Sequence, residues 1–366
     1  MIDIRKACTG LLVCGFLGCG ATGPQQKDGK IVAADVPAVV PEAQQLFEKG
    51  LATMARGPKH YEKAIEFFQK AVDRDKNLFE AWHNLGYLAS RQGRWLDSVE
   101  AYDKALSIQP ASRSSLLGLT NAYVRNGDPE SAQARFAAWL KADPNDDEIR
   151  LLYASALREA GGMDEALTQV LGLLAKNSNN AVAFNALGLI YRKQGKGGLA
   201  ETAFRRAAEL DPKAGYVWNN LGLLSIDDKN DQEAFAHFSK AIELDPNYVE
   251  AILNRAVVYL DCGAYEQALE ELKKAVALRA SDPDVHVALG VASRGLGKMA
   301  LAVQHYEKAL ELQPDYPPAL YDLGVLYMDH RDDKKSAREK LLLFRKVASS
   351  DDPKQEDATL RLKMLQ

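Results

Sequence analysis

Small and apolar positions recur along the chain with a fixed period from about Glu42 onward. A small residue returns every 34 residues at Gly86, Thr120, Ala154, Gly188, Gly222, Ala256, Gly290 and Gly324. A second series of small residues has the same period, at Ala132, Ala166, Ala200, Ala234, Ala268 and Ala302. A constant period of this length predicts an array of similar units that stack side by side.

Each period contains two stretches of about 13 residues with helical apolar periodicity. A polar turn such as the one around Gly93 separates them. Most units end near a proline, as at Pro212 and Pro246, and proline cannot continue a helix interior. Each unit is therefore predicted to be a helix–turn–helix pair. The small residue of the first helix would let the second approach closely, so a larger side chain at Gly222 would overpack the contact.

These units resemble tetratricopeptide (TPR) repeats. The similarity is clearest in the segments AWHNLGY (81–87), YVWNNLG (216–222) and AIELDP (241–246). It implies an all-α fold, a right-handed superhelical solenoid of about nine TPR units over residues 42–348. Residues 349–366 are expected to hold a polar-faced helix that caps the last pair.

The third and fourth units depart from the pattern. Trp139 and Leu173 stand where other units have alanine, and Arg150 stands where other units have a large apolar residue such as Trp82. These substitutions suggest a looser junction between residues 139 and 180.

The first residues have the features of a secretory signal. Arg5 and Lys6 precede a short, mostly apolar stretch from Ala7 to Leu17, and Cys19 follows it. Residues 16–19 (FLGC) resemble the lipobox of bacterial lipoproteins. The resemblance implies that residues 1–18 are a removed signal peptide and that Cys19 carries a diacylglycerol and an N-acyl chain such as palmitate. An ordinary signal cleaved near Ala21 is the alternative.

The residues after Cys19 predict where the protein resides. Residues 19–41 have no helical period and are predicted to be a flexible tether. In lipoproteins that this segment resembles, an aspartate after the lipidated cysteine favours retention in the inner membrane. Gly20 stands there instead, which favours an outer-membrane lipoprotein on the periplasmic side.

The composition excludes several classes of protein. The 366 residues include 46 basic and 50 acidic side chains, with a net charge of −4, which disfavours a nucleic-acid binder. There is no catalytic motif and no Cys/His set with metal-ligand spacing. His83, His237, His286 and His305 are interpreted as packed or solvated side chains. We therefore expect no enzymatic activity, no metal, no small-molecule substrate and no cofactor besides the lipid on Cys19.

In TPR proteins the first helix of each pair lines a concave groove, and the resemblance places a partner-binding surface there. The predicted groove residues are Leu189, Arg192, Asn219, Leu223, Ile226, Leu253, Val257, Leu260, Val291, Arg294, Tyr321 and Val325. Most are aliphatic, which suits an amphipathic helix or an extended apolar segment. The alternative is that they only pad each first helix against its neighbours.

The sequence thus predicts a lipid-anchored scaffold that binds envelope proteins and assembles or localises an envelope machine. Its layout resembles a TPR lipoprotein of myxobacterial gliding motility. Two alternatives remain open. One is a pilotin-type secretin assembly factor, resembling lipoproteins of type IV pili. The other is an accessory regulator of a cell-envelope biosynthetic enzyme.

Overall fold

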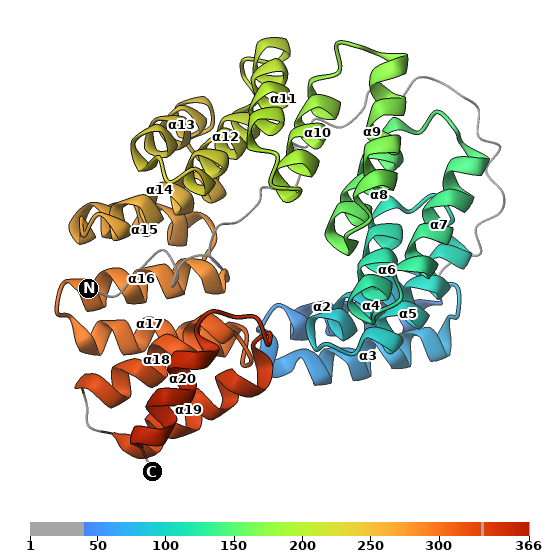
Figure 1. The fold of residues 1–366 in the computed structure, drawn as a ribbon. Helices are drawn as coiled ribbons and strands as arrows, with labels where there is room; N and C mark the ends of the chain where they lie inside the picture. The colour runs from blue at the N-terminus through green and yellow to red at the C-terminus, as the bar shows by residue number, and fades with distance from the viewer. Residues whose placement is uncertain (1–39, 331–332, 366) are drawn as a thin grey trace. The chain divides into compact units, whose positions relative to one another are not determined.

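The computed structural model describes residues 40–330 and 333–365. These residues form nineteen α-helices and one short 3-10 helix, with no strand in the described ranges (Figure 1). The predicted signal peptide (1–18), Cys19 and most of the predicted tether (19–41) lie outside the described residues. Within them, no helix combines the length and the apolar character needed to cross a bilayer.

The helices alternate between the first and second members of nine pairs, called A and B helices below. The A helices are α2 (Pro41–Met54), α4 (Phe79–Arg91), α6 (Arg113–Arg125), α8 (Asp147–Ala160), α10 (Ala181–Lys193), α12 (Gly215–Asp227), α14 (Val249–Asp261), α16 (Pro283–Gly295) and α18 (Pro317–His330). The B helices are α3 (Tyr61–Arg74), α5 (Trp95–Ile108), α7 (Pro129–Ala142), α9 (Met163–Lys176), α11 (Gly197–Leu210), α13 (Asp231–Leu244), α15 (Tyr265–Leu278), α17 (Met299–Leu312) and α19 (Lys334–Val347). The 3-10 helix η1 (Pro58–His60) fills the two-residue insertion of the first pair, and α20 (Gln355–Met364) follows the last pair. The predicted all-α fold class is confirmed.

The turns within the pairs repeat one backbone conformation. A residue with positive φ occurs every 34 residues in six of these turns, at Gly93, Gly127, Gly161, Gly195, Gly263 and Gly297. Lys229 occupies the same position in the sixth pair with a φ of 60°. Glycine adopts this left-handed region without the steric cost that a Cβ brings. Lys229 is therefore the one strained member of the series.

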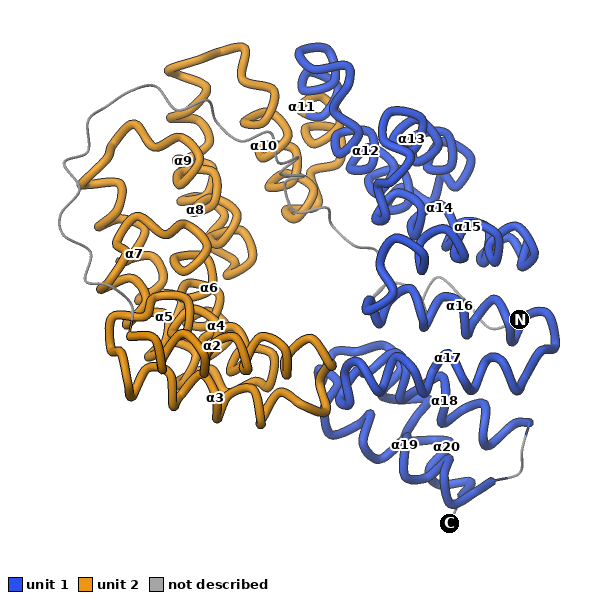
Figure 2. Tube along the Cα trace, turned by 180° about the vertical axis from the view of Figure 1, so that it is seen from behind, with its two compact units in different colours: residues 1–18, 204–366 blue, residues 19–203 orange. Residues whose placement is uncertain are grey.

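The chain divides into two compact units, which Figure 2 colours separately. The N-terminal unit comprises the described residues up to Ala203, and the C-terminal unit begins at Phe204. Each has its own buried apolar clusters. Phe68 and Phe136 belong to clusters of the first unit, and Leu272 and Tyr306 belong to the largest cluster of the second. The array predicted over residues 42–348 is thus divided within α11.

Close packing within the pairs depends on the small residues of the A helices. A Cβ added at Gly222 would lie 2.5 Å from the ring of Phe238, and one at Gly290 would lie 2.4 Å from Tyr306. In the N-terminal unit, the ring of Tyr102 on α5 lies similarly close to two glycines, Gly86 on α4 and Gly118 on α6. The structure therefore confirms the physical reason for the 34-residue series of small positions.

The capping helix α20 differs from its prediction. It buries Ala358 and Leu362 against Leu341 and Phe344 of α19. Leu360 and Met364 lie on its opposite face and are exposed. The expected polar outer face is therefore wrong at these two positions.

Candidate protein-binding surface

The predicted groove residues are mostly inaccessible in the structure. The buried ones are Asn219, Leu223, Leu253, Val257, Leu260, Val291 and Val325. The half-buried ones are Leu189, Arg192, Ile226, Arg294 and Tyr321. Leu189 and Arg192 belong to the N-terminal unit, and all the other predicted groove residues belong to the C-terminal unit.

The aliphatic members are used for packing within the C-terminal unit. Leu223 packs in a cluster with Ala234 and Phe238 of α13. Leu253, Val257, Leu260 and Val291 belong to the largest apolar cluster of that unit. Each of α12, α14, α16 and α18 buries eight or nine of its 13 or 14 residues. The prediction of an exposed apolar wall at these residues is therefore wrong, and the burial supports the padding alternative.

The polar groove residues contact neighbouring repeats of their own chain. The amide nitrogen Nδ2 of Asn254 donates to Oδ1 of Asn219 at 2.9 Å, between the buried faces of α12 and α14. Arg294 on α16 lies 3.6 Å from Asp322 on α18. The hydroxyl of Tyr321 donates to Asp357 of α20. These side chains thus help to fix each repeat against the next.

Among the described A helices, exposed large apolar side chains lie in the N-terminal unit, while B helices expose others such as Leu96, Leu171 and Leu199. Gly50 of α2 packs against the ring of Phe68 in the same way as Gly86 of α4 packs against the ring of Tyr102. The residues that follow these two glycines, Leu51 and Tyr87, are therefore equivalent. The exposed fractions are 36% for Leu51, 40% for Tyr87 and 38% for Leu117. Asn121, one period after Tyr87, is also exposed. We call Leu51, Tyr87, Leu117 and Asn121 the A-helix row.

A polar contact links two of the helices that carry the A-helix row. Nδ1 of His83 on α4 lies 2.9 Å from the hydroxyl of Ser115 on α6, which ties two of the helices together. Burial lowers the pKa of His83, which favours the neutral imidazole. The two-residue insertion at Gly57 shifts Leu51 out of the 34-residue register. Tyr87, Leu117 and Asn121 keep that register, but the period alone does not show that they are exposed.

Exposed arginines lie at the carboxyl ends of the same helices. Arg91 and Arg125 are in the last turns of α4 and α6, and Arg56 follows α2. Cations at this end of a helix are stabilised by its dipole, so part of their role is local. They also give the A-helix row a basic border. The surface therefore offers apolar contact next to positive charge.

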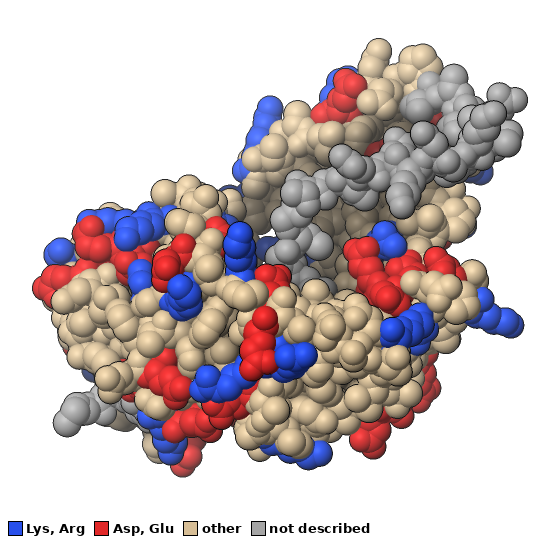
Figure 3. Space-filling model, turned by 90° about the horizontal axis from the view of Figure 1, so that it is seen from above, with Lys and Arg blue, Asp and Glu red and all other residues tan. Residues whose placement is uncertain are grey.

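Charged side chains elsewhere on the surface are of mixed sign. On the face that Figure 3 shows, the lysine and arginine side chains lie among the aspartate and glutamate side chains. This mixture agrees with the near balance of 46 basic and 50 acidic residues in the sequence. Nucleic-acid binders usually gather basic side chains on one face or along one helix, and the visible face does not have that pattern.

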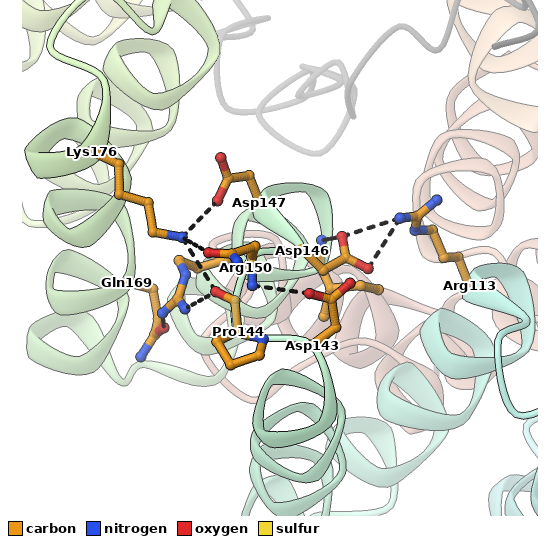
Figure 4. A network of polar contacts seen from close by, with 10 residues as sticks. Arg113, Asp143, Pro144, Asp146, Asp147, Arg150, Gln169 and Lys176 are labelled. Carbon is orange, nitrogen blue, oxygen red and sulfur yellow. Dashed lines mark hydrogen bonds and ion pairs between the residues drawn. The ribbon is translucent and has the colours of Figure 1, made fainter. Parts of the chain in front are cut away.

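The irregular third and fourth pairs are joined by a polar network, shown in Figure 4. Asp146 begins α8 by accepting a hydrogen bond from the backbone N–H of Ile149 at 3.0 Å. Its carboxylate also accepts from Arg113 of α6, at 3.0 and 3.1 Å, and from the indole of Trp139 at 3.2 Å. Burial works to raise the pKa of Asp146, but these hydrogen bonds and the Arg113 charge hold it below its usual value.

Arg150 and Lys176 complete the network on its other side. The guanidinium of Arg150 donates to Oε1 of Gln169 at 2.9 Å and to the carbonyl of Pro144 at 3.0 Å. Lys176 reaches the same carbonyl and the carboxylate of Asp147, both at 3.3 Å. Polar contacts thus stand where other repeats have a large apolar side chain. The looser junction proposed for residues 139–180 stays a prediction, now with a defined set of contacts.

Two of the histidines that the sequence left scattered meet in the C-terminal unit. Nδ1 of His286 lies 3.4 Å from Nδ1 of His305, and Nε2 of His286 lies 3.1 Å from the carbonyl of Ala280. Burial lowers the pKa of both imidazoles. Across the described residues, no group of three or more His, Cys, Asp or Glu side chains is placed to hold a metal ion.

Comparison with known families agrees with the helix pairs and their period. Models of tetratricopeptide repeats match residues 185–249, 225–290 and 294–330, and the middle TPR-like domain of cilia and flagella-associated protein 70 matches residues 48–211. The chain is a tetratricopeptide-repeat protein. Because TPR folds are generally binding scaffolds, the family assignment supports a role in protein–protein interaction.

The sequence relatives of this TPR protein match only part of its chain and a smaller part of their own. The peroxisomal targeting signal receptor of Candida albicans is 25% identical over 53% of this chain and 34% of its own. Protein FlbA of Caulobacter vibrioides is 29% identical over 46% of this chain and 28% of its own. The chain thus spans about a third of the length of these curated relatives.

Solved structures share the fold at low sequence identity. A TPR protein from Parabacteroides merdae has a TM-score of 0.50 at 18% identity, over 68% of this chain and 97% of its own. PilF of Pseudomonas aeruginosa has a TM-score of 0.50 at 18% identity, over 59% and 97%. The Cut9–Hcn1 structure has a TM-score of 0.54 at 17% identity, over 88% and 69%.

Proposed function

We propose that this TPR protein is a non-enzymatic scaffold that binds envelope proteins and assembles or localises an envelope machine. In this proposal, lipid on Cys19 holds it at the periplasmic side of the outer membrane. The machine favoured is one for gliding motility. The protein uses no cofactor besides the covalent lipid, and it acts by binding rather than by turnover.

The observation that carries the binding role is the A-helix row with its basic border. Three large apolar side chains, Leu51, Tyr87 and Leu117, are each more than one third exposed on A helices of one unit. Exposed apolar patches with a charged border are typical of protein interaction sites. Because Arg91 and Arg125 lie beside the row, the partner segment should combine apolar side chains with acidic ones. An amphipathic acidic helix or an extended acidic strand would fit.

A pilotin-type role in secretin assembly for type IV pili is the second candidate. The observation that favours it is the shared fold with PilF of Pseudomonas aeruginosa. A regulator of a cell-envelope biosynthetic enzyme is the third candidate, and it would bind its enzyme through the same row. Loss of secretin multimers in a deletion strain would favour the second candidate, whereas intact multimers with lost gliding would favour the first.

The binding surface is tested by in-cell cross-linking and affinity purification of the Tyr87→Glu/Leu117→Glu variant. Both side chains are exposed, so the fold should survive, and the added negative charge should repel an acidic partner. The matched control is Leu171→Glu, since Leu171 is 51% exposed on the B helix α9. We expect the partner to be lost with the double variant and kept with the control. Equal recovery with both would contradict the assignment of this surface.

The anchor is tested in the same strains with Cys19→Ala. Without the thiol no lipid can be added, and we expect the protein to move from the membrane fraction to the soluble periplasm. Continued membrane attachment would refute the anchor while leaving the result for the A-helix row intact.

A further inference from the structure

The exposed face of α20 carries a short and regular stripe of side chains. Its exposed residues from Glu356 onward are Glu356, Leu360, Lys363 and Met364. At 100° per residue these four lie within one arc of about 100° on the helix. The exposed fractions of Leu360 and Met364 are 53% and 72%. Terminal helices of repeat arrays usually present a polar outer face, so these two apolar side chains need an explanation.

The rest of α20 is engaged within the C-terminal unit. Figure 1 shows α20 beside α18 and α19. Asp357 accepts hydrogen bonds from Tyr321 and from Arg361, and Arg361 also bonds to Asp329 at 3.0 Å. These contacts hold the helix in place with its apolar stripe outward.

The two charges of the stripe are not part of these contacts. Among the described residues, neither Glu356 nor Lys363 is in an ion pair. Their order along the helix is acidic in the first turn and basic in the last turn. A helix with this order is complementary to a copy of itself that runs in the opposite direction, because each acid then faces the partner's base.

We propose that α20 pairs with α20 of a second copy of this chain in an antiparallel, twofold-symmetric contact. The twofold axis that pairs Glu356 with Lys363 passes between residues 359 and 360, so Leu360 packs near this axis against its own counterpart. Glu356 of each protomer faces Lys363 of the other, and Met364 covers the flank. A twofold contact of this kind is self-complementary and closes after two subunits. The contact is small, and we therefore expect a reversible dimer that forms at high micromolar concentration.

The test is sedimentation velocity of the purified protein at a series of concentrations, with single charge reversals. We expect Glu356→Lys alone and Lys363→Glu alone to weaken dimerisation by about tenfold or more, since each creates like-charge contacts. Mixing the two variants should restore association, because the heterodimer places a base opposite an acid at both of its charge contacts. Leu360→Glu should also abolish the dimer, and circular dichroism confirms that each variant is folded.

Three results would overturn the proposal. One is a wild-type protein that stays monomeric up to millimolar concentration. Another is a Leu360→Glu variant that dimerises as the wild type does. The third is a mixture of the two charge variants that associates no better than either variant alone.

Discussion

Replacement of Gly118 by alanine gives a sharp test of how the pairs pack. A Cβ at Gly118 would lie 2.2 Å from Cζ of Tyr102, and a Cβ at Gly86 would lie 2.8 Å from the other part of the same ring. Tyr102 is almost fully buried, so its ring cannot move away from one glycine without approaching other core atoms. Overpacking of this kind costs about 1–3 kcal/mol. Alanine returns roughly 0.5–1 kcal/mol through its better helix propensity, which leaves a net loss of about 0–2.5 kcal/mol, with about 1 kcal/mol at the middle of both ranges.

The control is the same substitution at Gly172. This glycine lies inside α9, and a Cβ there would meet no atom within 4 Å. Gly172→Ala should therefore stabilise the chain by the propensity gain alone, about 0.5–1 kcal/mol. Because long repeat arrays do not always unfold in one step, the assay is native-state hydrogen exchange of amides in α4–α6 and in α9. If Gly118→Ala and Gly172→Ala change protection in the same direction, the argument from the Tyr102 contact is refuted.

Two further predictions concern the C-terminal unit. Burial raises the pKa of Asp284 to about 6, with Asp282 adding to the rise and with the Tyr316 hydrogen bond and Arg279 opposing it. Because the pKa of this carboxyl is raised in the folded state, its contribution to stability is present below about pH 4 and is lost as the pH rises through about 6. Asp284→Asn should therefore be more stable than the wild type at about pH 7.5, by up to about 3 kcal/mol, and as stable as the wild type at about pH 4. Urea unfolding of both proteins at both pH values measures the difference in their free energies of unfolding. His286 and His305 contribute with the opposite sign, but equally in both proteins, so the difference removes their contribution. A difference between the two proteins that does not change with pH would contradict the prediction. Lys229→Gly should stabilise by roughly 0.5–1 kcal/mol because it removes the left-handed strain, whereas Gly195→Lys should destabilise; a lower melting temperature for Lys229→Gly would speak against the strain.

The helix pairs could be predicted from sequence because a period of 34 residues records their packing directly. Gly222 and Gly290 are small because a ring of the partner helix occupies the space of a side chain. This is a local constraint between neighbours in sequence, and it repeats many times. The division of the chain at Ala203 could not be predicted in this way, since α11 keeps the periodic residues Ala200, Phe204 and Ala207 of the other B helices.

The binding surface could not be predicted in the same way, because the period shows which positions are equivalent but not which are exposed. Leu223 and Tyr87 occupy equivalent positions, yet Leu223 is buried and Tyr87 is 40% exposed. The difference follows the burial of the helices, since α12 buries eight of its 13 residues and α14 buries nine, whereas α4 buries five of 13. The outer face of α20 was mispredicted for a related reason. Its few residues carry two apolar faces, and periodicity alone does not show which one the preceding pair covers.

The polar network around Asp146 has a mechanical consequence for the N-terminal unit. Most neighbouring pairs are held by buried apolar groups, whose separation exposes surface that water solvates poorly. Between α7 and α9, the hydrogen bonds of Arg113, Arg150 and Lys176, which water can replace, add to a buried apolar contact among Phe136, Ile149 and Tyr153. Salt screens the charges of these side chains, so this polar share of the cohesion weakens as ionic strength rises. A protein held under load at both ends of this unit would therefore yield there more readily at high salt than at low salt.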